Sequence, residues 1–163
     1  MNPTMLRDAL ARMAASVAVL TSGEPGHVRG VTLTSFVGLS LSPPLAAFAC
    51  HAGSRMLAGI APGDLVGVAI LSERQEVIAQ RCATPGRGPL PDSLVTRGEY
   101  GVPYLSHGVA HFVLRLASRH HAGDHVLVIA EILDAGSTGM APLLYHHREY
   151  RRLAVGWPQG DAA

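Results

Sequence analysis

The segment Gly30–Pro44 places hydroxyl side chains among apolar residues, and it carries the clearest binding chemistry in this 163-residue sequence. The hydroxyls offer hydrogen bonds along an extended backbone without any formal charge. Such an edge suits a flat heterocycle, although composition alone favours β-forming residues on a solvated strand face. The residues concerned are Thr32, Thr34, Ser35, Ser40 and Ser42.

Nine histidines raise the question of a metal site, because imidazole is the commonest metal ligand in proteins. Two pairs are spaced four residues apart, His107 with His111 and His121 with His125. That spacing brings two imidazoles together only on a helix. One pair lies in an apparent strand and Gly123-Asp124 interrupts the other, so the sequence predicts no metal site.

The common nucleotide and hydrolase signatures are absent from the sequence. It contains no G-x-G-x-x-G, no G-x-x-x-x-G-K-[ST] and no G-x-S-x-G. A nucleotide-type ligand, if one binds, must therefore be held by the surface of a barrel.

The composition is that of a globular chain of 17.1 kDa, which suits one domain over residues 1–163. Hydrophobic residues make up 48% and charged residues only 15%, which excludes disorder and indicates a buried subunit interface. The formal net charge of +1 gives no reason to expect a nucleic acid or an anionic membrane as partner.

The cysteines and the apolar runs indicate the compartment. Cys50 and Cys82 form neither a CxxC pair nor a disulfide framework, which fits a reducing cytoplasm. The apolar runs are far shorter than the roughly 18 residues that a membrane span needs. Residues 13–20 could pass for the core of a signal peptide, but Asp8 and Arg12 lie close before them and no clear cleavage site follows. We therefore expect an unprocessed cytoplasmic protein.

Hydrophobic periodicity predicts the elements that must position these residues. Helices are predicted over residues 3–14 and 54–60, the second with a Ser54 cap, and a capping-box pattern of Ser72 with Gln75 precedes a third helix. The Pro- and Gly-rich residues 84–102 are predicted to form a loop or lid. Strands are predicted over residues 16–21, 28–36, 37–41, 45–50, 65–71, 111–117, 126–133 and 143–153.

The order of these elements predicts the fold class. Strands follow one another directly along most of the chain, without the regular alternation of strand and helix that parallel sheets require. This order favours a mainly β fold, an antiparallel barrel with peripheral helices, over a doubly wound sheet.

From about residue 6 to residue 153 the sequence resembles the short flavin reductase family, the NAD(P)H:flavin oxidoreductase components of two-component monooxygenases. Residues 30–44 match the family block G-(M/V)-T-A-N-S-F-x-S-(V/L)-S-x-x-P-P, which is specific because it is long. Residues 142–153 resemble the closing P-L-L-Y-x-x-x-x-Y-R-x-L, and Gly123-Asp124-His125 resembles a short family motif. Further similarities cover residues 6–13, 16–21, 48–50 and 54–55.

The resemblance implies an FMN-binding split barrel, an antiparallel Greek-key-like barrel that forms a homodimer. It implies hydride transfer from NADH or NADPH to FMN or FAD, and delivery of the reduced flavin to a partner monooxygenase. Ser54 and Arg55 are the expected phosphate partners, and His125 is expected near the nicotinamide. Asp124 either orients His125 or serves only the turn. The flavin contacts that the resemblance implies are Thr32, Leu33, Thr34, Ser35, Ala49, Cys50, Ser54, Arg55 and Tyr150.

Several positions depart from the family pattern. Thr34 replaces its asparagine, Met56 replaces the threonine common after Ser-Arg, and residues 84–98 lack its aromatic stretch. These departures keep open a flavin-binding split-barrel protein that does not use nicotinamide and, with less support, a haem-type protein that uses the histidines. No acidic ribose-binding signature is present, so the sequence chooses neither between NADH and NADPH nor between FMN and FAD.

Overall fold

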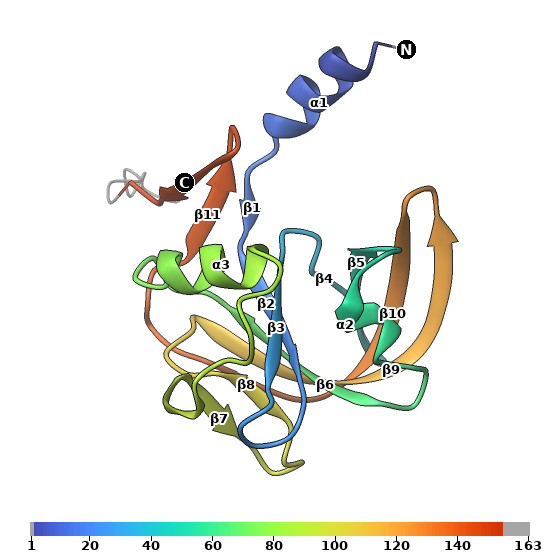
Figure 1. Ribbon diagram of the computed structural model, residues 1–163, viewed down its shortest axis with the longest axis vertical. Coiled ribbons are helices and arrows are strands. Elements are labelled where there is room, and N and C mark those ends of the chain that lie inside the picture. Colours follow the sequence, from blue (N-terminus) through green and yellow to red (C-terminus); the bar gives the residue numbers. More distant parts are fainter. Residues whose placement is uncertain (1, 155–163) are drawn as a thin grey trace, which may run out of the picture.

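A curved, open antiparallel sheet forms the centre of the computed structural model, which describes residues 2–154 (Figure 1). Its strands run in the order β3-β2-β6-β9-β10-β5-β4, and all neighbouring strands are antiparallel. This arrangement confirms the predicted mainly β antiparallel fold. The strands are β2 (Ala18–Ser22), β3 (Arg29–Leu33), β4 (Val37–Leu41), β5 (Pro44–His51), β6 (Leu65–Ile70), β9 (Ala110–Ala122) and β10 (His125–Ser137).

Smaller elements surround this sheet. One small sheet has the order β1-β11-β12, and β7 pairs with β8. The remaining strands are β1 (Ala15–Ser16), β7 (Val95–Arg97), β8 (Pro103–Leu105), β11 (Leu143–His146) and β12 (Glu149–Arg152). The helices described are α1 (Pro3–Ala11), α2 (Arg55–Ala58), α3 (Glu76–Ala83) and the 3-10 turn η1 (Asp92–Leu94).

The strand β2 is buried on both faces, which explains the apolar residues in succession at its start, Ala18, Val19 and Leu20. Because side chains alternate along a strand, Ala18 and Leu20 enter the core cluster that surrounds Phe48 inside the curved sheet. Val19 faces the other way, into a second cluster with Leu143 and other residues under α3 and the small sheet. The central strands are thereby fixed between two apolar layers.

The helices are shorter than the sequence predicts. The first ends at Ala11, and the predicted helix over residues 54–60 is the single turn α2. Ser72 and Gln75 do interact, since the Ser72 N–H donates to Gln75 Oε1 at 3.0 Å. The helix begins only at Glu76, however, so this contact closes the turn before α3 and does not cap the helix.

One loop prediction and one strand prediction are also wrong. The predicted loop over residues 84–102 contains η1 and β7, and β7 pairs with β8 directly after it. The predicted last strand over residues 143–153 is a hairpin, because the chain reverses at His147 and Arg148, which have φ values of 54° and 63°.

The two outer strands of the central sheet, β3 and β4, prepare the site. Each pairs with a strand on one side only in the described part of the chain. Residues 34–36 connect β3 to β4 (Figure 1). Residues of β3, of the end of β5 and of the start of β10 line one cavity, so the free edge of β3 lies near these two strand ends. Separately, none of the described helices is long and apolar enough to cross a membrane.

Candidate active site

A cavity of about 290 Å³ opens where the free edge of β3 meets the ends of β5 and β10, and we call it the β3 cavity. Its volume lies near the lower end of the roughly 300–1,000 Å³ found for small-molecule sites. Of the flavin and nicotinamide contacts expected from the sequence, all but Arg55 and Tyr150 line it, whereas Asp124 and the hydroxyl residues Ser40 and Ser42 do not. The lining consists of Val31, Thr32, Leu33, Thr34, Ser35, Ala49, Cys50, His51, Ser54 and His125.

The free edge of β3 supplies neutral hydrogen-bonding groups to the cavity. Because β3 pairs only with β2, its outer N–H and C=O groups have no partner strand in the described part of the sheet. The β3 cavity is lined by no carboxylate among the described residues. The resulting donor set is uncharged, directional and able to bind a planar ring along its edge.

The hydroxyl groups of residues 32–35 make different hydrogen bonds. The Thr32 hydroxyl donates to the Ala79 carbonyl of α3 at 2.6 Å, so it fastens the helix to the sheet and points away from the cavity. The Ser35 hydroxyl donates to the Ala49 carbonyl at 2.9 Å and accepts from the Ala49 N–H at 3.0 Å, which ties the connection after β3 to β5. Thr34 is exposed and lines the cavity.

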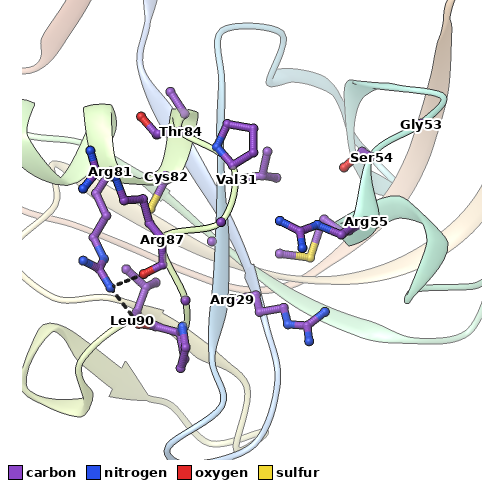
Figure 2. A pocket seen from close by; sticks show the side chains of 17 residues that line it. Arg29, Val31, Gly53, Ser54, Arg55, Arg81, Cys82, Thr84, Arg87 and Leu90 are labelled. Carbon is purple, nitrogen blue, oxygen red and sulfur yellow. Dashed lines mark hydrogen bonds between the residues drawn. The ribbon is translucent and has the colours of Figure 1, made fainter.

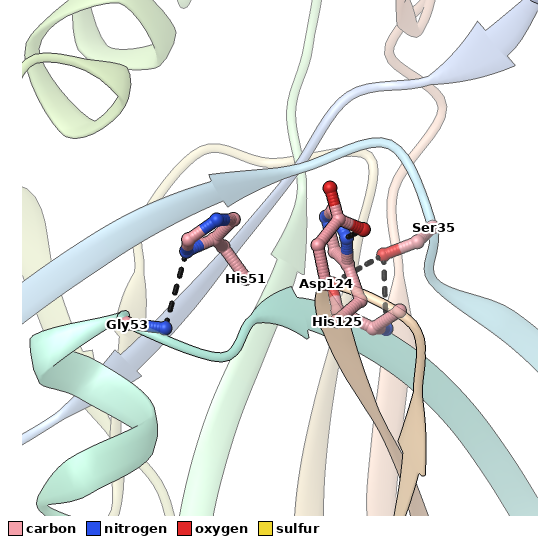
Figure 3. Close-up of polar contacts among 6 residues, drawn as sticks. Ser35, His51, Gly53, Asp124 and His125 are labelled. Atoms are coloured by element: carbon pink, nitrogen blue, oxygen red, sulfur yellow. Dashed lines mark hydrogen bonds and ion pairs between the residues drawn. The ribbon is translucent and has the colours of Figure 1, made fainter.

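His125 is held in one orientation at the mouth of the β3 cavity (Figure 3). Its Nδ1 lies 2.7 Å from Asp124 Oδ1. Because a carboxylate only accepts, this contact places the proton on Nδ1 and leaves Nε2 for a ligand. The hydrogen bond from His125 is the main cause that lowers the pKa of Asp124 from its ordinary value.

His51 completes this corner of the cavity. It is the register partner of His125 across β5 and β10, and the two rings meet edge to face with centroids 5.6 Å apart. Its Nδ1 accepts from the Gly53 N–H at 3.1 Å (Figure 3). Within residues 2–154, no group of three or more His, Cys, Asp or Glu side chains is placed to hold a metal ion.

Both thiols are protonated at neutral pH. Burial raises the pKa of Cys50 to about 11, although the charge of Arg119 acts in the opposite direction. Burial also raises the pKa of Cys82 to about 11, against the charge of Arg81. Cys50 therefore contributes an apolar, uncharged wall to the β3 cavity and no nucleophile.

A second cavity of about 460 Å³ adjoins the first, and we call it the arginine cavity. Val31 and Ser54 line both cavities, so the two adjoin along β3. Arg29 of β3 and Arg55 of α2 extend into the space between these two elements (Figure 2). Ser54 precedes α2 and its hydroxyl makes no capping bond, which leaves it available to a ligand. The predicted phosphate partners, Ser54 and Arg55, thus lie together at this cavity.

The loop after α3 forms the opposite wall of the arginine cavity. Arg81 Nη2 donates to the carbonyls of Arg87 and Pro89, at 2.8 and 3.0 Å (Figure 2). Gly30 lets this wall approach β3, because a Cβ there would lie 2.9 Å from Cys82 Sγ and 3.1 Å from Leu90 Cδ1. Gly30, the first residue of the family block, therefore allows α3 and the loop after it to pack closely against β3.

Tyr150 lies on β12, outside both cavities. Its ring meets that of Tyr145 with centroids 5.3 Å apart, and it packs against the cluster under α3. Burial raises the pKa of Tyr150, and Tyr145 and Glu76 act in the same direction. The flavin contact expected for Tyr150 gains no support from this placement.

Sequence reasoning missed several residues that line the cavities, among them His51, Arg29 and Arg87. His51 follows a predicted strand and carries no motif, so only its register with His125 reveals it. Arg29 stands directly before the glycine of the family block, and Arg87 lies between Gly86 and Gly88. The arginine between two glycines, in a segment without periodicity, is the sequence feature that could have indicated the loop wall of the arginine cavity.

The two cavities fit a flavin by the chemistry of their residues. The neutral, partly apolar β3 cavity suits a ring, and the adjoining arginines suit a phosphate. A riboflavin phosphate requires this order, a flat heterocycle followed by an anion.

Comparison with known proteins agrees with this geometry. A family profile described as "Flavin reductase like domain" matches residues 10–154. The reductase component of 4-hydroxyphenylacetate 3-monooxygenase from Thermus thermophilus is 33% identical, covering 93% of this chain and 96% of the relative. The FMN reductase (NADH) SmoA from Agrobacterium fabrum is 29% identical, covering 94% and 87% of the two chains.

A solved structure gives the same result for the fold. The NADH:FAD oxidoreductase SgcE6 of Streptomyces globisporus C-1027, solved with NAD and FAD fragments, superposes with a TM-score of 0.84 and 27% identity. The match covers 94% of each chain. The split barrel predicted from the sequence is thereby confirmed. Because the family profile spans nearly the whole described chain and relatives match along its length, this chain belongs to the flavin reductase like domain family.

Proposed function

We propose that the protein is an NADH-dependent flavin reductase, the reductase component of a two-component monooxygenase system. The observation that carries the proposal is that a neutral ring cavity, bordered by His125, adjoins an arginine-lined cavity. Relatives named as FMN reductase (NADH), NADH:FAD oxidoreductase and monooxygenase reductase component support it.

The residues of the β3 cavity bind and orient the two reactants. When bound, flavin supplies the acceptor of a hydride from NADH, and the products are NAD⁺ and reduced flavin. The free edge of β3 holds the ring with neutral groups, so no fixed carboxylate opposes the negative charge that reduction brings. Ser35 keeps the connection after β3 close to β5.

His125 has a positioning task in this proposal, with Asp124 behind it. Hydride transfer needs the nicotinamide to lie against the ring, and no side-chain acid is essential for that step. With Nδ1 bonded to Asp124, His125 offers Nε2 to the carboxamide of the nicotinamide. Ser54 and Arg55 hold the flavin phosphate beside α2.

We further propose that the protein works as a homodimer in the cytoplasm, with one domain per chain. Its helix α1 buries none of its residues against the chain and projects from the curved sheet (Figure 1). A second copy of the chain would cover it. Cys50 and Cys82 are free thiols, as a reducing compartment requires.

The decisive experiment measures NADH oxidation by the purified protein with and without added riboflavin, FMN or FAD. We expect oxidation only when a flavin is present, and reduced flavin that leaves the protein to reduce a soluble acceptor. Retention of a flavin through gel filtration without NADH consumption would contradict the proposal and identify a flavin-binding protein instead.

A further inference from the structure

The arginine cavity is larger and more cationic than the phosphate of a mononucleotide needs. Its volume is about 460 Å³, against about 290 Å³ for the β3 cavity. One terminal phosphate beside Ser54 and Arg55 leaves most of that space unfilled. The remaining space points to a ligand that continues beyond its first phosphate.

The charge of this cavity is unbalanced. Four arginines line it, and no carboxylate does among the described residues. Within residues 2–154, none of these arginines forms an ion pair with Asp or Glu. Uncompensated guanidinium groups at one concave site attract an anion of more than one charge. These residues are Arg29, Arg55, Arg81 and Arg87.

The wall opposite α2 is a built structure. Arg81 uses Nη2 to hold the carbonyls of Arg87 and Pro89, while its Nε is buried without a hydrogen-bond partner in the described structure. Gly86 and Gly88, with φ of 83° and 71°, let the loop turn around Arg87. The loop thereby has a fixed path beside β3, with an arginine exposed on it.

Apolar surface lies among these charges. Val31, Met56 and Leu90 line the cavity, together with two prolines of the loop. A flat purine base suits such a surface, and the arginines beside it suit a diphosphate.

From these features we infer that the arginine cavity binds the diphosphate and adenosine half of FAD, so that the protein selects FAD over FMN and riboflavin. The inference rests on the proposed function, because the ligand is the flavin whose ring occupies the β3 cavity. Arg29 and the loop of residues 84–90 determine the selection, and Arg55 holds the phosphate that FMN and FAD share.

The test is a set of equilibrium titrations with FAD, FMN and riboflavin, followed by flavin fluorescence and calorimetry and independent of NADH. The wild-type protein is expected to bind FAD about tenfold more tightly than FMN, the gain of one good charge-assisted contact. Arg29→Gln and Arg87→Gln are expected to weaken FAD binding severalfold and leave riboflavin binding unchanged. Arg74→Gln, an exposed arginine outside the arginine cavity, is the matched control and should keep the FAD preference.

Competition by adenine nucleotides identifies the occupant. ADP should displace FAD and leave bound riboflavin in place. Equal affinities for the three flavins would overturn the inference. Stronger binding of adenosine 2′,5′-bisphosphate than of ADP, without a flavin preference, would also overturn it, by assigning the cavity to NADPH. Failure of NADH oxidation with every flavin, while FAD still binds selectively, would count against the proposed function and not against this inference.

Discussion

At the residue scale, the contact between His125 and Asp124 orients the side chain that we propose receives the nicotinamide. The Nδ1 to Oδ1 distance of 2.7 Å gives the imidazole one tautomer and one orientation, although Asp124 itself is exposed. The turn is fixed independently, since the Asp124 carbonyl accepts from the Ala52 N–H at 2.9 Å. The Asp124 side chain can therefore be changed without losing the end of β10.

This contact predicts that Asp124→Ala lowers the rate of NADH-dependent flavin reduction about tenfold, because His125 loses its orientation. Flavin affinity should stay within about twofold of the wild type, since Asp124 does not line the β3 cavity. Anaerobic stopped-flow reduction and equilibrium flavin titration measure the two effects separately.

Asp124→Asn is the matched control for this prediction. The amide oxygen still accepts from Nδ1, so most of the rate should return, although the charge is gone. Equal losses in the two variants would assign the effect to charge and remove the orienting role. An unchanged rate in His125→Ala would remove the histidine from the reaction altogether.

The residue types of the site could be predicted from the sequence, but the direction of each side chain could not. Of the block Gly30–Pro44, residues 31–35 line the β3 cavity and the remaining residues do not. Strand alternation nevertheless turns the Thr32 hydroxyl toward Ala79, and only the packing of α3 on β3 shows this. His51 was missed for the same reason, because strand register is a property of two distant segments.

At the element scale, the approach of α3 and its following loop to β3 depends on one missing side chain. A Cβ at Gly30 would lie 2.9 Å from Cys82 Sγ, 3.1 Å from Leu90 Cδ1 and 3.1 Å from Val19 Cγ1. These neighbours belong to three different elements, so none can move without disturbing the packing of the others.

Gly30→Ala is therefore expected to lower the free energy of unfolding by about 1–3 kcal/mol through overpacking, measured by urea denaturation. It should also weaken FAD binding more than riboflavin binding, because it displaces the wall of the arginine cavity. Gly38→Ala is the control, since no atom lies within 4 Å of its added Cβ. Restored stability in Gly30→Ala with Cys82→Ala would show which contact causes the loss.

Other elements show why sequence patterns were insufficient. The hairpin of β11 and β12 reverses at His147 and Arg148, which adopt positive φ without the glycine or asparagine that announces such a turn. The β7 and β8 hairpin lies in a segment rich in proline and glycine, where no alternation is visible. The buried central strands, by contrast, could be predicted from the sequence because residues on both of their faces are apolar.

At the scale of the whole molecule, the described chain leaves apolar surface uncovered. In α1, Leu6 and Leu10 are 45% and 56% exposed, and none of the helix residues is buried. Met13, just after the helix, is 67% exposed. The helix is nevertheless tethered, since Asp8 pairs with Arg148 at 2.8 Å and the Ala11 carbonyl accepts from the His147 N–H. A tethered helix that presents apolar residues outward is suited to contact a second copy of the chain.

The dimer proposal predicts that Leu6→Ser with Leu10→Ser shifts the protein in sedimentation velocity from twice the chain mass of 17.1 kDa toward the monomer. Burying each leucine contributes about 1.5–3 kcal/mol, so losing two per chain should weaken association by several orders of magnitude. Thr4→Ser, on the face of α1 opposite Leu6, should leave the dimer intact. Because neither leucine lines a cavity, the monomer should still bind riboflavin. A wild-type protein that sediments as a monomer at micromolar concentration would contradict the proposal, and the exposed face of α1 would then need a different partner.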